Sequence, residues 1–68
     1  MVPLRVQRIL KLFQYSHLPN NLQEISRPFG ELAEKVAQNY PETDETYFAL
    51  RKLLEAKDCA VRASLTAD

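Results

Sequence analysis

Apolar residues recur at the three- and four-residue spacing of an α-helix in three stretches of the chain. The apolar positions are Val2, Val6, Ile9, Leu10 and Phe13 in the first stretch, Leu22, Ile25, Phe29, Leu32, Ala33 and Val36 in the second, and Leu50, Leu54, Val61 and Leu65 in the third. This spacing predicts amphipathic helices. We therefore expect an all-α protein, built from a short N-terminal helix and an antiparallel hairpin of two longer helices. The alternation of Val2, Leu4 and Val6 leaves a short N-terminal strand open as an alternative.

The second helix is expected to run from about Leu22 to Asn39. Asn20 or Asn21 can cap its start, because their side chains accept hydrogen bonds from free backbone N–H groups. Pro28 lies inside the apolar stripe of this helix. Because proline cannot donate a hydrogen bond to the carbonyl of Glu24, we expect the helix to kink at Pro28.

The third helix is expected to run from about Asp44 to Ala63 or beyond, capped by Thr43 or Asp44. It carries a row of small residues beside its row of larger apolar residues. The small residues are Ala49, Ala56, Ala60 and Ala63, next to Leu53. Two rows indicate two buried sides, whereas one partner helix covers only one side. The small-residue side is therefore expected to meet another chain, unless these alanines serve only as good helix formers.

The chain has 68 residues, so residues 1–68 are expected to form one small domain with a marginal core. Cys59 is the only cysteine and cannot form an intrachain disulfide. One His and one Cys cannot complete a structural zinc site of about four ligands, so no metal or cofactor is expected. Assembly into a homo-oligomer remains as the source of stability. The single cysteine and the lack of a secretory signal peptide indicate a reducing cytoplasm.

Nine basic and nine acidic residues give a formal net charge of zero, which argues against a general DNA- or RNA-binding protein. The charges are nevertheless sorted along the chain. Basic residues dominate positions 1–29 (Arg5, Arg8, Lys11 and Arg27 against Glu24), and acidic residues dominate positions 30–46 (Glu31, Glu34, Glu42, Asp44 and Glu45 against Lys35). This indicates either complementary charge between packed helices or subunits, or a small basic pocket for a compact anion. No apolar run approaches the roughly 18 residues of a membrane span, so no membrane contact is expected.

The sequence lacks the residue sets of common active sites. His17 is the only histidine, and it lies far along the chain from Cys59. A nucleophile needs a positioned base beside it. The sole glycine, Gly30, cannot form a glycine-rich phosphate loop. We therefore expect no enzyme activity.

Aromatic and basic residues gather around the first turn. Phe13, Tyr15 and His17 occur at alternate positions, and Arg27 follows early in the second helix. Aromatic rings can stack on a base, and a guanidinium can hold a phosphate through two hydrogen bonds. The combination suits a small nucleotide with few phosphates. Core packing of Phe13 and turn hydrogen bonding by His17 are the alternative explanation.

Two runs of this sequence resemble a known family. The run His17–Phe29 (HLPNNLQEISRPF), followed by Leu32 and Ala33, and the run Ala49–Ala63 (ALRKLLEAKDCAVRA) are similar to the phage anti-CBASS sponge proteins and to their hairpin-domain relatives among the anti-Thoeris proteins. The resemblance implies a helical hairpin that assembles into a homohexamer in the cytoplasm of the infected bacterial host. It also implies that the protein sequesters cyclic di- and trinucleotide messengers without cleaving them, so that CBASS effectors stay silent.

The resemblance further implies a set of binding residues. In the family, an aromatic side chain before the His-Leu-Pro turn stacks on a base, and it matches Phe13 or Tyr15 here. The basic residue before the proline of the second helix, usually lysine in the family, matches Arg27 and implies a phosphate contact. Lys57 and Arg62 are the matching candidates on the third helix for a separate trinucleotide pocket.

A second class of function fits the same sequence. A small helical oligomerisation or protein-interaction module of phage origin, with no nucleotide ligand, would use the aromatic and basic residues as interface core. This hypothesis predicts a stable oligomer that does not respond to nucleotides. An enzyme that degrades the messenger is a more distant alternative.

Overall fold

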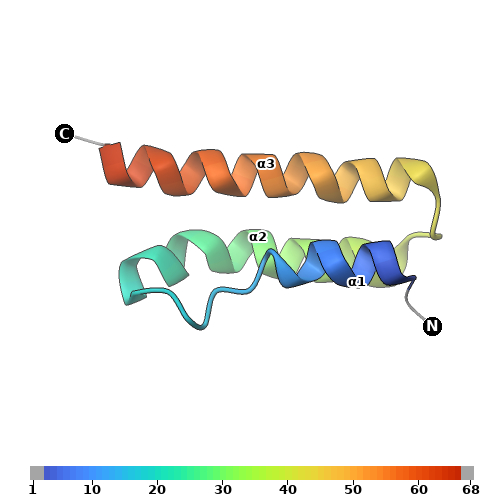
Figure 1. Cartoon of the computed structure of the whole chain (residues 1–68), viewed down its shortest axis with the longest axis horizontal. Helices are drawn as coiled ribbons and strands as arrows, with labels where there is room; N and C mark the ends of the chain where they lie inside the picture. The colour runs from blue at the N-terminus through green and yellow to red at the C-terminus, as the bar shows by residue number, and fades with distance from the viewer. Residues whose placement is uncertain (1–2, 67–68) are drawn as a thin grey trace.

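The computed structural model describes residues 3–66 and contains three helices, α1 (Leu4–Lys11), α2 (Asn20–Asn39) and α3 (Asp44–Thr66). Helix α3 runs back along α2 in the opposite direction, and α1 packs against both (Figure 1). The all-α prediction is confirmed for the described residues. The alternative of a short strand is wrong over 4–11, which are helical, while Val2 lies outside the described residues.

Helix α2 begins at Asn20, two residues before the predicted start. Its first turn is closed by the backbone of Pro19, whose carbonyl accepts hydrogen bonds from the N–H groups of Leu22 and Gln23, both at 2.9 Å. No side chain caps this end, so the prediction of an asparagine cap is wrong. The capping position is occupied by Pro19 (φ −57°, ψ 153°), which has no side-chain acceptor. Pro28 lies within α2, which continues through it to Asn39; the kink stays a prediction.

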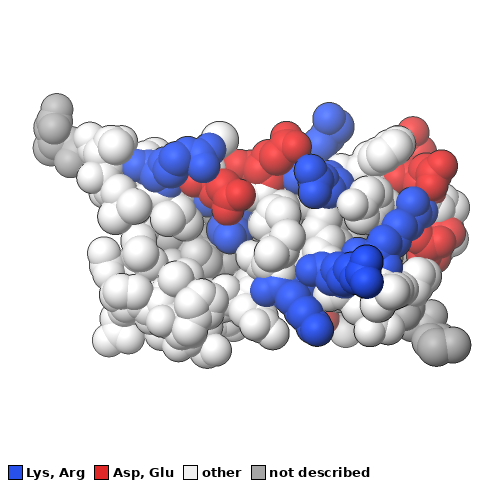
Figure 2. All heavy atoms as spheres, viewed as in Figure 1, with Lys and Arg blue, Asp and Glu red and all other residues white. Residues whose placement is uncertain are grey.

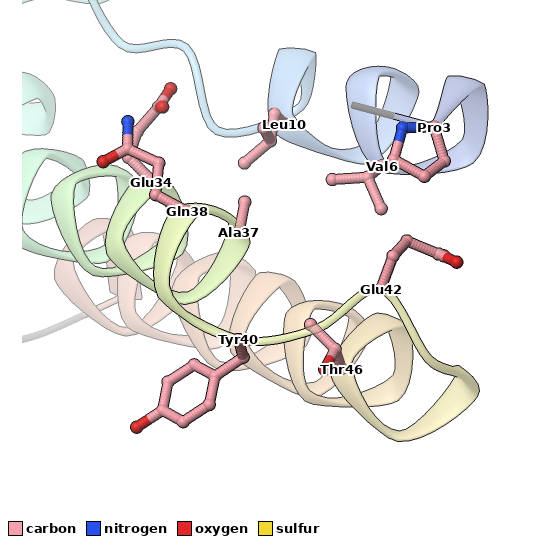
Figure 3. A pocket seen from close by; sticks show the side chains of 9 residues that line it. All are labelled: Pro3, Val6, Leu10, Glu34, Ala37, Gln38, Tyr40, Glu42 and Thr46. Carbon is pink, nitrogen blue, oxygen red and sulfur yellow. The ribbon is translucent and has the colours of Figure 1, made fainter. Parts of the chain in front are cut away.

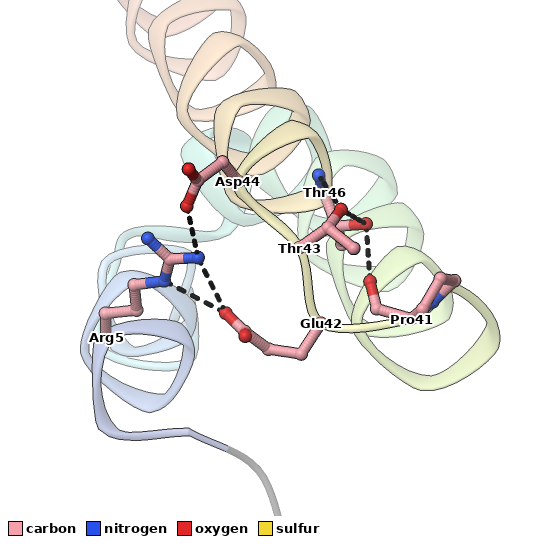
Figure 4. A network of polar contacts seen from close by, with 6 residues as sticks. All are labelled: Arg5, Pro41, Glu42, Thr43, Asp44 and Thr46. Atoms are coloured by element: carbon pink, nitrogen blue, oxygen red, sulfur yellow. Dashed lines mark hydrogen bonds and ion pairs between the residues drawn. The ribbon is translucent and has the colours of Figure 1, made fainter.

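Helix α3 is capped by Thr43, as one of the two alternatives predicted. The Thr43 Oγ1 accepts a hydrogen bond from the backbone N–H of Thr46 at 3.2 Å, and the Thr46 hydroxyl donates to the carbonyl of Pro41 at 2.7 Å (Figure 4). Asp44 is the first residue of the helix itself. These contacts tie the connection between α2 and α3 to the first turn of α3.

The buried core is small and draws on all three helices. It consists of Val6, Ile9, Phe13, Ala33, Leu50 and Leu54. The apolar row of α3 is therefore buried at Leu50 and Leu54, whereas Leu65 is 65% exposed. Leu65 lies near the C-terminal end of α3, beyond Leu54, the last residue of this helix in the core cluster.

The small-residue row of α3 faces outward for most of its length. Ala49, Ala56 and Ala63 are exposed, and Ala60 is half-buried. The protein as a single chain thus buries one of the two sides predicted for α3. None of the helices described over 3–66 has the length and apolar character needed to cross a membrane.

Candidate functional site

Tyr15 and Arg27 form the central pair of the candidate site. The Arg27 guanidinium carbon lies 5.6 Å from the centroid of the Tyr15 ring, a cation–π contact. Tyr15 precedes α2 in the connection from α1, and Arg27 projects from the second turn of α2. Arg27 is exposed and Tyr15 is half-buried. Within residues 3–66 Arg27 has no ion pair, so its charge is free to meet an anion.

Gly30 explains how Tyr15 lies so close to α2. A Cβ atom at this position would stand 3.3 Å from the Tyr15 Cε1 and 3.2 Å from the backbone oxygen of Phe13. The missing side chain therefore lets the connection between α1 and α2 lie directly on the helix. Arg27 is one helical turn before Gly30, which places its guanidinium over the ring that rests there.

Phe13 belongs to the core and not to the site. Its side chain is 3% exposed and packs with the buried residues of all three helices. A ring buried in this way has no face available to a base, so the prediction of Phe13 as a binding residue is corrected. Of the two aromatic residues left open by the sequence, Tyr15 is the one with accessible surface.

His17 is exposed in the connection between α1 and α2. The segment around it is fixed by Gln23, whose Nε2 donates to the carbonyls of Leu18 at 2.7 Å and Ser16 at 3.3 Å. The backbone on both sides of His17 is thus tied to the first turn of α2. His17 therefore lies on the same fixed segment as Tyr15. The binding role of His17 stays a prediction.

Lys57 and Arg62 lie on the second half of α3, and no contact joins them to the Tyr15–Arg27 pair within the described residues. The Lys57 ammonium forms an ion pair with Asp58 at 3.0 Å, and its side chain is 14% exposed. The Arg62 guanidinium lies 3.4 Å from the Cys59 sulfur. Of the two, Arg62 is therefore the one whose charge is more available to a bound anion.

The hollows beside Tyr15 and α1 carry acidic side chains. A cavity of about 170 Å³ next to Tyr15 is bordered by Glu31 and Glu34. A larger one of about 390 Å³, between α1, α2 and the α2–α3 connection, is bordered by Glu34 and Glu42 and, among residues 3–66, by no basic side chain (Figure 3). Neither suits a phosphate. A single chain thus presents Tyr15 and Arg27 on its surface without an enclosed anion pocket around them.

Arg5 forms the main polar network of the molecule, which the sequence did not single out. Its Nε donates to Glu42 at 2.9 Å and its Nη2 to Asp44 at 3.0 Å (Figure 4). Its guanidinium carbon also lies 4.7 Å from the centroid of the Tyr47 ring. The hydrogen bond to Glu42, and to a smaller extent the one to Asp44, raises the pKa of Arg5 above its ordinary value. For Arg5 alone, this confirms the interpretation of complementary charge between packed segments, because this base of residues 1–29 pairs with two acids of residues 30–46.

A half-exposed aromatic ring thus lies beside an unpaired guanidinium on one surface, and a separate ion-pair network lies at the opposite end of α2. No protein-family model, curated protein or solved structure matches this chain.

Proposed function

We propose that this protein binds cyclic di- and trinucleotide messengers and sequesters them without cleavage, as a phage anti-CBASS sponge. The observation that carries the proposal is the Tyr15–Arg27 pair, in which a half-exposed ring lies beside an unpaired guanidinium. A cyclic dinucleotide offers two chemical features, flat bases and phosphates, in a compact molecule. The pair offers a matching group for each.

Arg27 supplies the phosphate contact in this proposal. A guanidinium presents a planar fork of donors that holds a phosphate through two parallel hydrogen bonds. Lysine at this position, as in the resembling family, would supply a point charge without the fork. Arg27 thus keeps the charge and adds a preference for the orientation of the phosphate.

Assembly completes the pocket in this proposal. One chain exposes the pair on an open surface, whereas ligand pockets usually enclose about 300–1,000 Å³. A second chain placed over Tyr15 and Arg27 would close the site and bury further apolar surface. The exposed alanine row of α3 and the small core support a homo-oligomer, for which we propose a hexamer.

The test is a titration of the protein with a panel of cyclic di- and trinucleotides by calorimetry and thermal shift, with the mass of the assembly measured in solution. A ligand that binds only the folded assembly raises the Tm by mass action. The ligand released by proteolysis of the complex should be intact. No heat and no Tm shift across the panel would refute the proposal.

Arg27→Ala should weaken binding of the cyclic dinucleotide by about 1.5–3 kcal/mol, the usual contribution of a hydrogen bond to a charged group. Lys35→Ala is the matched control, because Lys35 is an exposed base on the same helix without an ion pair among the described residues. Arg62→Ala should affect cyclic trinucleotides alone. Equal affinities for Arg27→Ala and Lys35→Ala would remove Arg27 from the site.

An interaction module without a nucleotide ligand is the second candidate. It is favoured by large apolar side chains that remain exposed on all three helices, namely Leu4, Leu32, Phe48 and Leu65, and by the exposed Leu12 directly after α1. Such a protein would form a stable oligomer and give no response to any cyclic nucleotide. The titration and the mass measurement together separate the two candidates.

A further inference from the structure

A basic hollow lies between α1 and α3, apart from Tyr15 and Arg27. It has a volume of about 210 Å³ and is lined by Arg5, Arg8, Ile9, Leu12, Tyr47 and Arg51. Figure 2 shows basic side chains grouped over α1 and the first half of α3 on the face it displays. Three guanidinium groups from two helices thus border one small space.

Only one of these three guanidinium groups has its charge balanced by a carboxylate among the described residues. Arg5 is paired with Glu42 and Asp44, at 2.9 and 3.0 Å. Arg8 and Arg51 are exposed and form neither an ion pair nor a side-chain hydrogen bond with any residue that the structure describes. Two like charges that line the same hollow repel one another, and an anion between them would remove that repulsion.

The rest of the hollow is apolar and partly fixed in position. Ile9 of α1 and Leu12, directly after this helix, supply aliphatic surface, and Tyr47 supplies a ring from α3. The Tyr47 ring is held by Arg5, whose guanidinium lies over it at 4.7 Å and is itself fixed by two carboxylates. The hollow therefore offers two free guanidinium groups at its border and a preorganised aromatic surface beside them.

We propose that this hollow binds a compact organic phosphate monoester, with the phosphate between Arg8 and Arg51 and the organic group against Tyr47, Ile9 and Leu12. A phosphate dianion matches two guanidinium forks in charge and in donor geometry. The hollow is smaller than the roughly 300–1,000 Å³ pockets of drug-sized ligands, which favours a ligand with a single ring or a short chain. This site shares no residue with the Tyr15–Arg27 pair and goes beyond the proposed function.

The test uses phenyl phosphate and inorganic phosphate as probes at constant ionic strength, with binding followed by amide chemical shifts in NMR spectra. Phenyl phosphate should bind more tightly than inorganic phosphate, because only the ester reaches the apolar surface. Arg8→Gln and Arg51→Gln should each lower the affinity for phenyl phosphate about tenfold or more. Both positions are exposed, so the variants should keep the Tm of the unmodified protein. Lys35→Gln, which removes an exposed charge elsewhere, should leave the affinity unchanged.

Arg51→Lys separates a site from a general electrostatic attraction. It keeps the charge but loses the planar fork, so the affinity for phenyl phosphate should fall although the net charge is unchanged. The proposal is overturned if neither probe gives saturable shifts, if inorganic phosphate binds as tightly as the ester, or if Lys35→Gln weakens binding as much as Arg8→Gln does. Phenyl phosphate binding is followed at the amides of Tyr47 and Arg51, which line the hollow. Arg8→Gln should leave cyclic dinucleotide binding at Tyr15 and Arg27 intact, so that failure of this site and failure of the nucleotide site are distinguishable.

Discussion

Replacing Ser26 by alanine should stabilise the protein, although it removes a polar group from the middle of a helix. Ser26 is 1% exposed, and its hydroxyl has no hydrogen-bond partner among the described residues. An unpaired buried hydroxyl costs about 1–3 kcal/mol, which the substitution removes. Alanine adds up to about 0.5 kcal/mol of helix propensity. The void left by one hydroxyl oxygen is small and costs only a few tenths of a kcal/mol at about 24 cal/mol per Å³. The net gain should be about 1–3 kcal/mol.

The measurement is urea denaturation together with a thermal melt, at one protein concentration because assembly makes the Tm depend on concentration. In a domain of this size, 1 kcal/mol shifts the Tm by about 4–8 °C. Ser64→Ala is the matched control, since Ser64 is also helical but exposed, and its hydroxyl donates to the carbonyl of Val61 at 2.8 Å. The control shares the propensity gain and should stay within about 0.5 kcal/mol of the unmodified protein. A lower Tm for Ser26→Ala than for Ser64→Ala would refute the reasoning and show that the Ser26 hydroxyl has a partner in solution.

Three further substitutions test the fold. Leu50→Ala should lower the free energy of unfolding by about 2–5 kcal/mol because Leu50 is fully buried, whereas Leu65→Ala, at an exposed position, should leave it almost unchanged in the same urea titration. Gly30→Leu should displace Tyr15 from α2, since even a Cβ atom would lie 3.3 Å from the ring; a tyrosine emission spectrum and an unfolding free energy equal to those of the unmodified protein would contradict this. Thr43→Ala should cost about 1 kcal/mol by removing the cap of α3, with Thr43→Ser as the control that retains the hydroxyl.

The helices were predictable because each carries its own periodic pattern, whereas their starts depended on details of the backbone. The stripe that includes Ile25 and Val36 identifies α2 whatever its surroundings. Its first residue was missed because proline, which has no side-chain acceptor, occupies the capping position, so that Asn20 lies inside the helix as its first residue. The residue before α3 is Thr43, whose hydroxyl can accept a hydrogen bond from the first turn, so the cap of α3 was predictable from the sequence.

The candidate site was harder to predict, because it depends on how the segment between two helices lies on α2. Their alternate spacing made Phe13 and Tyr15 equally good candidates for stacking on a base. In the structure, Phe13 is buried in the core and Tyr15 is half-exposed. A signal was present in Gly30, because an isolated glycine within a helix indicates a close approach of another segment. The hollow between Arg8 and Arg51 left no such signal, since it depends on where α1 packs against α3.

The contacts of Arg5 have a consequence for the order of folding. They join residues that are 37 and 39 positions apart in sequence, whereas α2 and α3 are joined by a connection of only four residues, 40–43. Closing a longer loop costs more chain entropy, so α2 and α3 should associate first and α1 should dock afterwards. Helix α1 also packs less extensively against α2 and α3 than these two pack against each other, so it should open at a lower free energy than they do. Proteolytic cleavage should therefore begin between residues 12 and 19, where departure of α1 frees the chain.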